Sequence, residues 1–348
     1  MVALADTEIW ADALEMPAAL DHTLHACEGF EETAELLRNA SVTRIVVSGN
    51  GASFYVAHAL WLASLAGGDG APEVIAVPAG MLADGRFRWH AGDRLLVISS
   101  SGELRDAVEV VNGKLPLPYV AVTSRRDSTL GTHATSSAIV HVAQQRAVTH
   151  TQAYVGNLVT ALALWAAVTH DAELAAAVAA APDACARSLA AVAEWLPGAV
   201  GDAGDPSAAV VFGSHFGWTA AMEAALLLKE LARIPAEGVE TREGATSASF
   251  GLSNSSLALS LSADDPAAAE AEAICKSMGA RLVRAPRVEA PDPRLTPLTL
   301  FPPALALAIE LSLRRGENVD RPLWTESYFS TARVTDAGGD GTPGRAAG

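Results

Sequence analysis

The chain has 348 residues, half of them apolar, with 24 basic against 40 acidic side chains. This length allows two domains of ordinary size, each with a substantial core. The net charge of −16 argues against a nucleic acid or an anionic membrane surface as a partner. We expect no signal peptide and no apolar run long enough to span a membrane. The three scattered cysteines indicate neither a disulfide framework nor a metal site. The composition therefore predicts a cytoplasmic, reduced protein without a metal or cofactor.

Apolar runs alternate with helical stretches along the chain. After helices within 7–40, the first half is expected to contain strands 43–48, 73–77, 93–99, 119–123 and 138–142 with helices 54–65, 104–112 and 152–168. A helical stretch 169–196 and a Gly/Pro-rich linker 197–207 precede strands 208–212, 256–262 and 281–284 with helices 218–234, 266–278 and 303–315. This alternation predicts the α/β class, with two doubly wound parallel sheets of the flavodoxin-like type. The expected domains are 1–170 and 171–334, followed by a disordered tail, 335–348.

One strand-to-helix junction is rich in hydroxyl groups. The run Leu95–Gly102 (L-L-V-I-S-S-S-G) ends an apolar strand in three serines and a glycine, before the helical stretch 104–111. This pattern predicts a buried parallel strand that brings hydroxyl and backbone N–H groups to a helix N-terminus, where a phosphate binds favourably. Alternatively, one serine only caps the helix. A second Gly/Ser-rich junction at 49–53, after strand 43–48, favours the phosphate because both junctions would lie at the carboxyl edge of one sheet.

The two motifs, S-G-N-G-A-S-F and V-I-S-S-S-G-E, resemble those of the sugar isomerase (SIS) domain family. That family includes the isomerase half of glucosamine–fructose-6-phosphate aminotransferase and related phosphosugar isomerases, deaminases and deglycases. The stretch Val210–Leu231 resembles the glycine turn and the A-x-E-x-A-L-x-x-K-E helix of the same family. The resemblance extends over residues 20–330 and implies two tandem domains related by a pseudo-two-fold axis. It also implies a homodimer, at whose interface the aromatic residues of Trp324–Phe329 are candidates.

By motif position, the resemblance implies a sugar-phosphate ligand held by Gly51, Ser53, Ser99, Ser100 and Ser101. The family usually has glutamine as the middle residue of the serine tripeptide and threonine at the position of Leu104. The missing threonine hydroxyl removes one donor, worth roughly 1 kcal/mol. In the second copy, strand 256–262 is followed by Ala-Asp-Asp-Pro, whose carboxylates would repel a phosphate. One phosphate site per chain is therefore expected.

Two carboxylates, Glu223 and Glu230, lie seven residues apart on the apolar helix expected over 218–234, and therefore on one face. Buried carboxylates are costly unless they are paired or used, and burial raises their pKa toward neutrality. The pattern alone leaves open a structural ion pair between Glu230 and Lys229 or Arg233. The resemblance implies that Glu230 is the base that moves a proton between C1 and C2 of an open-chain sugar phosphate, and that Glu223 is structural.

Several family positions differ in this chain. The lysine at the start of the last helix of the first domain is replaced by Gln152, and the family's H-G-P loop corresponds to 242–246, without a histidine. The C-terminal catalytic lysine is missing from 320–326. Two substitutes are candidates: His150 as a general acid, because imidazole titrates near neutrality, and Glu243 acting from a loop. The alternatives, that His150 only caps a helix and that Glu243 is only a solvated loop carboxylate, remain open.

The sequence thus predicts a phosphosugar-processing enzyme, either an aldose–ketose isomerase or an amino-sugar-phosphate deaminase or deglycase. Glu230 would transfer the proton between C1 and C2. A glutaminase module is not expected, because the chain has neither the extra length nor an N-terminal nucleophilic cysteine. The alternative is a sugar-phosphate binding protein that has lost catalysis. The missing histidine and lysine favour this alternative, and the retained Lys-Glu pair opposes it.

Overall fold

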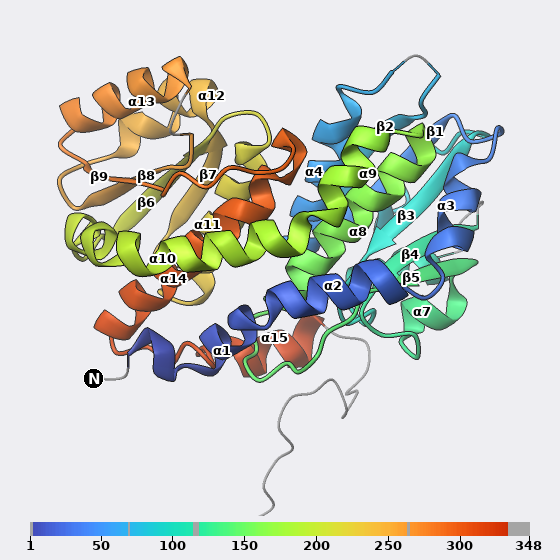
Figure 1. The fold of residues 1–348 in the computed structure, drawn as a ribbon, viewed down its shortest axis with the longest axis horizontal. Coiled ribbons are helices and arrows are strands. Elements are labelled where there is room, and N and C mark those ends of the chain that lie inside the picture. The colour runs from blue at the N-terminus through green and yellow to red at the C-terminus, as the bar shows by residue number, and fades with distance from the viewer. Residues whose placement is uncertain (1–2, 69, 114–117, 263–264, 333–348) are drawn as a thin grey trace, which may run out of the picture. The chain divides into compact units, whose positions relative to one another are not determined.

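The computed structural model describes residues 3–68, 70–113, 118–262 and 265–332 (Figure 1). The chain divides into two compact units, each built on one parallel sheet. The first-sheet unit contains residues 15–182 and 324–332, and the second-sheet unit contains 3–14 and 183–323. These limits differ from the predicted domains, 1–170 and 171–334, because segment 3–14 belongs with the second sheet and 324–332 with the first. The predicted tail, 335–348, lies outside the described residues.

The first sheet has five parallel strands in the order β2-β1-β3-β4-β5. This is the order of flavodoxin-like sheets, and the direction of winding reverses between β1 and β3. In such folds the loops that follow the two strands at this switch point form the ligand site. The strands are β1 (Arg44–Gly49), β2 (Glu73–Pro78), β3 (Asp93–Ile98), β4 (Tyr119–Thr123) and β5 (Ser136–Ile139).

Helices cover both faces of the first sheet, so its strands are apolar and buried on both sides. On one face, α5 (Ala79–Ala83), α6 (Arg105–Asn112) and α7 (Thr129–His133) share a core with Val46, Leu95 and Ala121 of the strands. On the other face, α4 packs against α8 and α8 against α3, as Figure 1 shows. The other helices of this unit are α2 (Met16–Ala26), α3 (Phe30–Arg38), α4 (Ala52–Ser64), α8 (Gln152–Thr169), α9 (Ala172–Ala179) and α15 (Thr325–Ala332). Helix α1 (Glu8–Leu14) belongs to the second-sheet unit.

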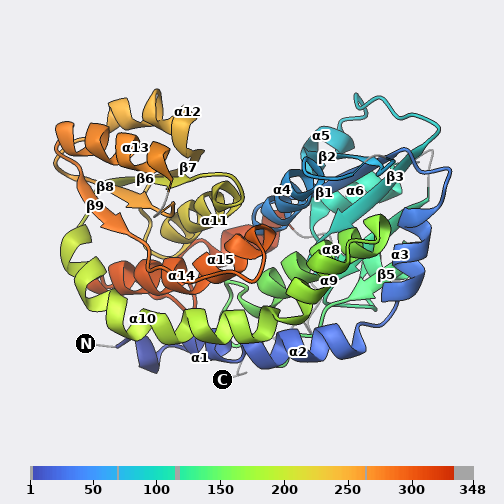
Figure 2. The same cartoon turned by 45° about the horizontal axis from the view of Figure 1, so that its top comes forward.

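The second sheet repeats this arrangement with four parallel strands in the order β7-β6-β8-β9. Helices α11 and α14 pack together on one face, and α12 and α13 lie side by side on the other (Figure 2). The predicted fold class, two doubly wound parallel α/β domains, is therefore confirmed. The elements are β6 (Ala208–Gly213), α11 (Gly217–Glu230), β7 (Ala236–Glu240), α12 (Thr241–Ala245), β8 (Ser256–Ser260), α13 (Pro266–Ser277), β9 (Arg281–Arg284) and α14 (Thr296–Arg314).

The predicted linker at 197–207 is wrong in its first part. Helix α10 (Ala181–Ala203) continues through Pro197, because Leu196, Val200 and Ala203 are buried on its inner side. Burial of this apolar stripe outweighs the missing hydrogen bond of the proline. In the same way, α14 begins seven residues before the predicted start at 303 and includes two internal prolines. Packing therefore extends both helices across residues that disfavour helix locally.

Two helical segments are apolar and long enough to cross a membrane, judged by length and composition: α8 and Pro293–Arg314. A third counts if the bent pair α9 and α10 forms one span. The expectation that the chain has no such segment is therefore wrong. Within the structure, 83% of the α8 window and 89% of the Pro293–Arg314 window are buried. A helix that is apolar on all sides fits such a core position as well as a membrane.

Candidate functional site

The three serines of the predicted phosphate motif lie where β3 ends and before α6 begins. Because β1 and β3 are hydrogen-bonded neighbours, the loops that follow them meet at the same edge of the sheet, at its switch point. Ser99 is buried, whereas Ser100 and Ser101 are half-buried. The structure thus brings the predicted serines together at the edge where ligands of such sheets bind.

The three serine hydroxyls share one hydrogen-bonding pattern. Each oxygen accepts a hydrogen bond from an N–H group, and no residue that the structure describes accepts a proton from any of them. A hydroxyl has one proton and two lone pairs, so each serine keeps its proton for an acceptor outside the protein. The pairs are Gly102 N to Ser99 Oγ at 3.2 Å, Asn157 Nδ2 to Ser100 Oγ at 3.0 Å and Glu103 N to Ser101 Oγ at 3.3 Å.

These hydrogen bonds differ from those that the sequence predicts for the donor groups of the loop. The sequence predicts that serine hydroxyls and backbone N–H groups before the helix both hold the anion directly. Instead, the N–H groups of Gly102 and Glu103 hold serine oxygens. The loop therefore offers hydroxyl protons, backed by amide donors, to a ligand that carries acceptors.

The serine loop is fixed from behind by Gly102 and Glu103. Gly102 has a φ of +66°, and a Cβ at this position would overlap the Ser128 hydroxyl, so only glycine fits. The buried Glu103 carboxylate accepts the backbone N–H and the hydroxyl of Thr129, both at 2.7 Å. Glu103 therefore joins the loop to the first turn of α7. The sequence suggested no role for this residue.

The loop after β1 is held by Asn50, which the sequence analysis also missed. Its Nδ2 donates to Asp106 Oδ2 of α6 at 2.7 Å, and its Oδ1 accepts the backbone N–H of Ala79 at 3.1 Å. Gly51 follows with a φ of +55° and begins α4. Ser53 is half-buried in the first turn of that helix, and its hydroxyl makes no hydrogen bond within the described ranges. The predicted residues Gly51 and Ser53 thus lie at the same sheet edge as the serine loop.

Unsatisfied polar atoms surround this edge. The Ser48 hydroxyl at the end of β1 and the Asn157 Oδ1 atom are buried and have no partner among the described residues. Arg125, in the loop after β4, pairs two guanidinium nitrogens with Asp127 at 3.3 Å, while its buried Nη1 has no described partner. Buried polar groups without partners cost about 1–3 kcal/mol each, which bonds to a ligand would offset. Arg125 is a candidate ligand-binding cation at this edge that the sequence analysis did not identify.

The two carboxylates of α11 lie in the second-sheet unit and differ in burial. Glu223 is 3% exposed, and its Oε2 has no hydrogen-bond partner in the described structure. Burial, with a smaller contribution from the charge of Glu230, raises the pKa of Glu223 well above its usual value, against the opposing effect of Lys229. Glu230 is half-buried at the last residue of the helix. The expectation of a buried carboxylate is therefore right for Glu223, whereas Glu230 is only partly buried, at the point where the helix ends instead of continuing to 234.

The remaining catalytic candidates are divided between the units. Glu243 is exposed on α12 and accepts the Ser247 hydroxyl at 2.7 Å, in the second-sheet unit. His150 is half-buried directly before Thr151, the N-cap residue of α8, in the first-sheet unit. Their catalytic roles stay predictions. Within the described part of the chain, no cluster of three or more His, Cys, Asp or Glu side chains is arranged to hold a metal ion.

Gln152 stands at the position of the family's lysine and is tightly bound within the protein. It is 1% exposed; its Oε1 accepts the N–H of Ala143 at 2.9 Å, and its Nε2 donates to Glu15 at 3.3 Å and to the carbonyl of Gln144 at 3.2 Å. Glu15 also pairs with Arg146 at 2.6 Å. Gln152 therefore fixes the segment that leads into α8.

The equivalent edge of the second sheet differs in its hydrogen bonds. The Ser260 hydroxyl at the end of β8 is buried without a described partner, but other hydroxyls there are bound within the protein. Ser214 N donates to Ser262 Oγ at 2.6 Å, and the Ser214 hydroxyl donates to Thr241 Oγ1 at 2.9 Å. Asp265 is the N-cap residue of α13, and its Oδ1 accepts the backbone N–H of Ala267 at 2.9 Å. These hydroxyls are used inside the protein, unlike those of the first sheet. The single phosphate site per chain stays a prediction.

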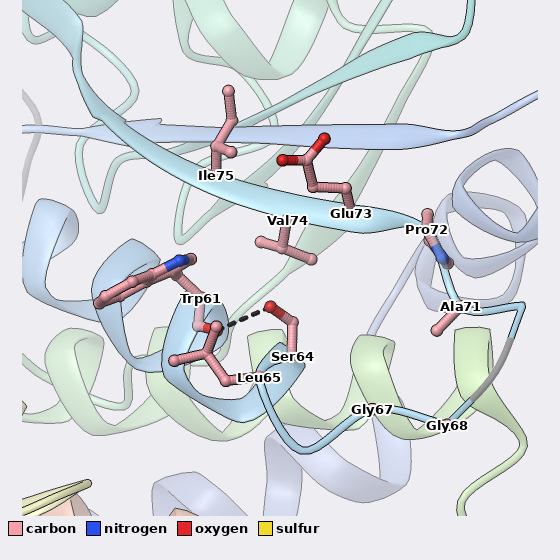
Figure 3. Close-up of a pocket in the computed structure, with 10 residues that line it drawn as sticks. All are labelled: Trp61, Ser64, Leu65, Gly67, Gly68, Ala71, Pro72, Glu73, Val74 and Ile75. Atoms are coloured by element: carbon pink, nitrogen blue, oxygen red, sulfur yellow. Dashed lines mark hydrogen bonds between the residues drawn. The ribbon is translucent and has the colours of Figure 1, made fainter.

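A pocket of about 270 Å³ lies elsewhere in the first-sheet unit (Figure 3). It is formed by Trp61 and Leu65 at the end of α4, the loop around Gly67, and Val74 and Ile75 of β2. The β2 residues that line it belong to the first half of the strand, and the switch-point loops follow the opposite, carboxyl ends. Its only charged lining residue among those described is Glu73, which would repel an anion. This pocket is therefore not the phosphate site.

No protein-family model and no curated protein matches this sequence. Solved structures do match. The C-terminal domain of glucosamine–fructose-6-phosphate aminotransferase from Francisella tularensis has a TM-score of 0.74 at 15% identity, over 89% of this chain and 97% of that chain. Tagatose-6-phosphate ketose/aldose isomerase from Escherichia coli has a TM-score of 0.72 at 17% identity, over 92% and 96%. Glucosamine-6-phosphate deaminase from Thermotoga maritima has a TM-score of 0.66 at 16% identity, over 89% and 97%. The predicted resemblance is therefore confirmed for the fold: the chain has the two-domain fold shared by these sugar-phosphate enzymes.

Proposed function

We propose that the chain binds a phosphorylated sugar at the switch point of the first sheet and converts it. The observation that carries this proposal is the pattern of the three serines, whose hydroxyl protons are all left for an external acceptor. A phosphate supplies several acceptor oxygens, and hydrogen bonds to a charged group are about twice as strong as neutral ones. The free Ser53 hydroxyl and the unpartnered Arg125 nitrogen at the same edge support an anionic ligand.

The proposed reaction is an aldose–ketose isomerisation or the deamination or deglycation of an amino-sugar phosphate. In the isomerisation, the Glu230 carboxylate removes the proton from C2 of an open-chain aldose as the carbonyl oxygen at C1 gains one, which gives the enediol. Return of the proton to C1, as the C2 hydroxyl gives up its own proton, yields the ketose. The proton lost at O2 balances the proton gained at O1, so no atom is gained or lost. The partial exposure of the half-buried Glu230 supports access to a ligand. The structures with this fold include, by name, a ketose/aldose isomerase, a domain of an aminotransferase and a deaminase.

We also propose a cytoplasmic homodimer. Residues 323–328 offer aromatic and apolar surface for such an interface. Trp324 and Tyr328 pack edge to face, and the side chains of Tyr328 and Leu323 are exposed. Sedimentation of the purified protein at several concentrations tests the oligomeric state. A monomer at all concentrations contradicts this part of the proposal.

A second function, binding without catalysis, is favoured by one observation. Gln152, at the position of a family lysine, is fully used in holding the segment before α8. A chain that keeps the serine loop but lacks this lysine retains the means to bind a phosphate and lacks part of the means to move protons. This alternative predicts affinity for sugar phosphates with no turnover.

The test measures binding and turnover separately. Thermal stability is recorded with fructose 6-phosphate, glucosamine 6-phosphate and the same sugars without phosphate, for the wild type and for S101A, E230Q and the control S64A. Ser64 lies at the end of α4, and its hydroxyl donates to the carbonyl of Trp61. A ligand that binds only the native state stabilises it by RT ln(1 + L/Kd), where L is the free ligand concentration, so at a fixed ligand concentration the rise in melting temperature grows with the logarithm of the affinity.

Each outcome decides between the alternatives. We expect stabilisation by phosphorylated sugars only, reduced in S101A and unchanged in S64A. We expect turnover in the wild type and a loss of about a hundredfold or more in E230Q, in line with general-base catalysis. Stabilisation without turnover supports the binding protein, and no stabilisation by any phosphosugar contradicts both functions.

A further inference from the structure

Asn157 is a polar residue inside a buried apolar helix. It is 1% exposed on α8, whose other buried residues are mostly alanine, leucine and valine. A buried amide is costly unless its hydrogen bonds are made. Its Nδ2 makes one, to the Ser100 hydroxyl oxygen at 3.0 Å, whereas its Oδ1 has no partner in the described structure. The single bond of this buried amide is therefore directed at the middle serine of the phosphate loop.

The surroundings of Ser100 leave its hydroxyl one direction in which to donate. The Ser100 carbonyl accepts the N–H of Ser124 at 3.1 Å and the hydroxyl of Thr123 at 3.3 Å, so the backbone is fixed by the end of β4. The hydroxyl oxygen uses one lone pair for Asn157. No acceptor for the Ser100 proton exists among the residues that the structure describes. An external acceptor would complete the arrangement.

We infer that Asn157 is a positioning residue that turns the Ser100 proton toward the phosphate. The inference rests on the proposed sugar-phosphate site and adds a residue to it. Because Asn157 Oδ1 has no partner, no other bond of this amide fixes its orientation. The reversed amide would accept the Ser100 proton and withdraw it from the ligand. A bound phosphate selects the orientation found here, in which Asn157 donates to Ser100 and Ser100 donates outward.

Two substitutions separate this role from simple packing. Asn157→Asp keeps the size of the side chain, but a carboxylate only accepts hydrogen bonds, so it captures the Ser100 proton and adds negative charge. Asn157→Ala removes the bond and leaves the Ser100 hydroxyl free to rotate. Thr160→Val is the matched control: Thr160 is also buried on α8 with an unpartnered hydroxyl, and valine has the same shape.

Binding of inorganic phosphate and of fructose 6-phosphate is measured by calorimetry for these variants, for Ser100→Ala and for the double variant S100A/N157A. We expect Ser100→Ala to weaken binding by about tenfold or more, since a hydrogen bond to a charged group is lost. Asn157→Asp should weaken it at least as much, Asn157→Ala by a smaller factor, and Thr160→Val not at all. In the S100A background, Asn157→Ala should add nothing, because its effect passes through Ser100.

The outcomes distinguish this inference from the proposed function. If Ser100→Ala binds both ligands like the wild type, the phosphate site itself is wrong. If Ser100→Ala weakens binding but Asn157→Asp and Asn157→Ala do not, the site stands and the positioning role falls. Additive losses in the double variant also overturn the positioning role, since they show that Asn157 acts independently of Ser100. Should Asn157→Asp fail to fold, the double-mutant cycle of Ser100→Ala and Asn157→Ala decides the positioning role by itself.

Discussion

Glu223 makes the stability of the second-sheet unit depend on pH, and Glu223→Gln should remove that dependence. The carboxyl group is 3% exposed with its Oε2 unpartnered, and burial and the charge of Glu230 raise its pKa well above the usual 4.5. Below pH 4.5 the group is protonated in both the folded and the unfolded state, so it adds no pH dependence. Above pH 4.5 the unfolded state releases the proton while the folded state keeps it, so folding becomes less favourable as pH rises.

The size of this effect follows from the linkage relation. Each pH unit between 4.5 and the folded pKa costs up to about 1.4 kcal/mol of unfolding free energy, so the loss between pH 5 and pH 7 is at most about 2.7 kcal/mol. Glutamine has the same shape and never ionises. The variant should therefore match the wild type near pH 4.5 and exceed it increasingly toward pH 7. The unfolding free energy is measured in urea at pH 5, 6 and 7.

A matched control is Glu270→Gln, since Glu270 is exposed on α13 of the same unit. It should leave the pH dependence of the wild type unchanged. The reasoning is refuted if Glu223→Gln keeps the pH dependence of the wild type, or if it is less stable than the wild type at pH 7. Either result would show that Glu223 is ionised in the folded protein and held by a cation.

Three other changes test the first-sheet unit and the thiols. Gly102→Ala should cost about 1–3 kcal/mol of stability, because the positive φ of Gly102 and the Ser128 hydroxyl exclude a side chain. As the control, Gly68 has open space around it, so the Gly68→Ala variant should have a melting temperature within a degree or two of the wild type. Asp93→Asn should cost about 3 kcal/mol of stability at pH 7, since the buried Asp93 carboxylate accepts two hydrogen bonds from Arg44. Burial alone would raise the pKa of Asp93, but these bonds lower it below 3.8. The difference in unfolding free energy between wild type and variant, measured in urea, should therefore vanish as pH falls through that pKa. Burial raises the pKa of half-buried Cys27 to about 11, and of buried Cys185 and Cys275 to about 12 and about 11. The native protein should therefore react slowly with a disulfide reagent at pH 8 and fast once unfolded, and a fast native reaction would contradict these raised pKa values.

Local patterns allowed most of the first sheet to be predicted. The apolar runs at 93–99 and 119–123 give β3 and β4 within one residue, because a strand buried on both faces has to be apolar throughout. Strand β7 was missed for the same reason. Its sequence, A-E-G-V-E, carries two glutamates and a glycine, and it forms a strand through pairing with β6 at the edge of the sheet.

The position of the serine loop was predictable, but its chemistry was not. The direction in which Ser100 donates depends on Asn157, which lies 57 residues away on another element. No local pattern reports such a contact. The exposure of Glu230 was also hidden, because it depends on the residue at which α11 ends, and the apolar pattern continues past that point to Ile234. Sequence patterns thus identified the loop, and tertiary contacts decide what it offers to a ligand.

At the proposed sugar-phosphate site, the anchors behind the two loops reduce the ordering that binding requires. Asn50 joins the loop after β1 to α5 and α6, and Glu103 joins the serine loop to α7. Because these two loops are already fixed, they do not have to become ordered around an incoming ligand, and little conformational entropy is lost on binding. Association then depends on diffusion and charge, both of which sugar phosphates of similar size share. Such ligands should bind at similar rates and differ in residence time.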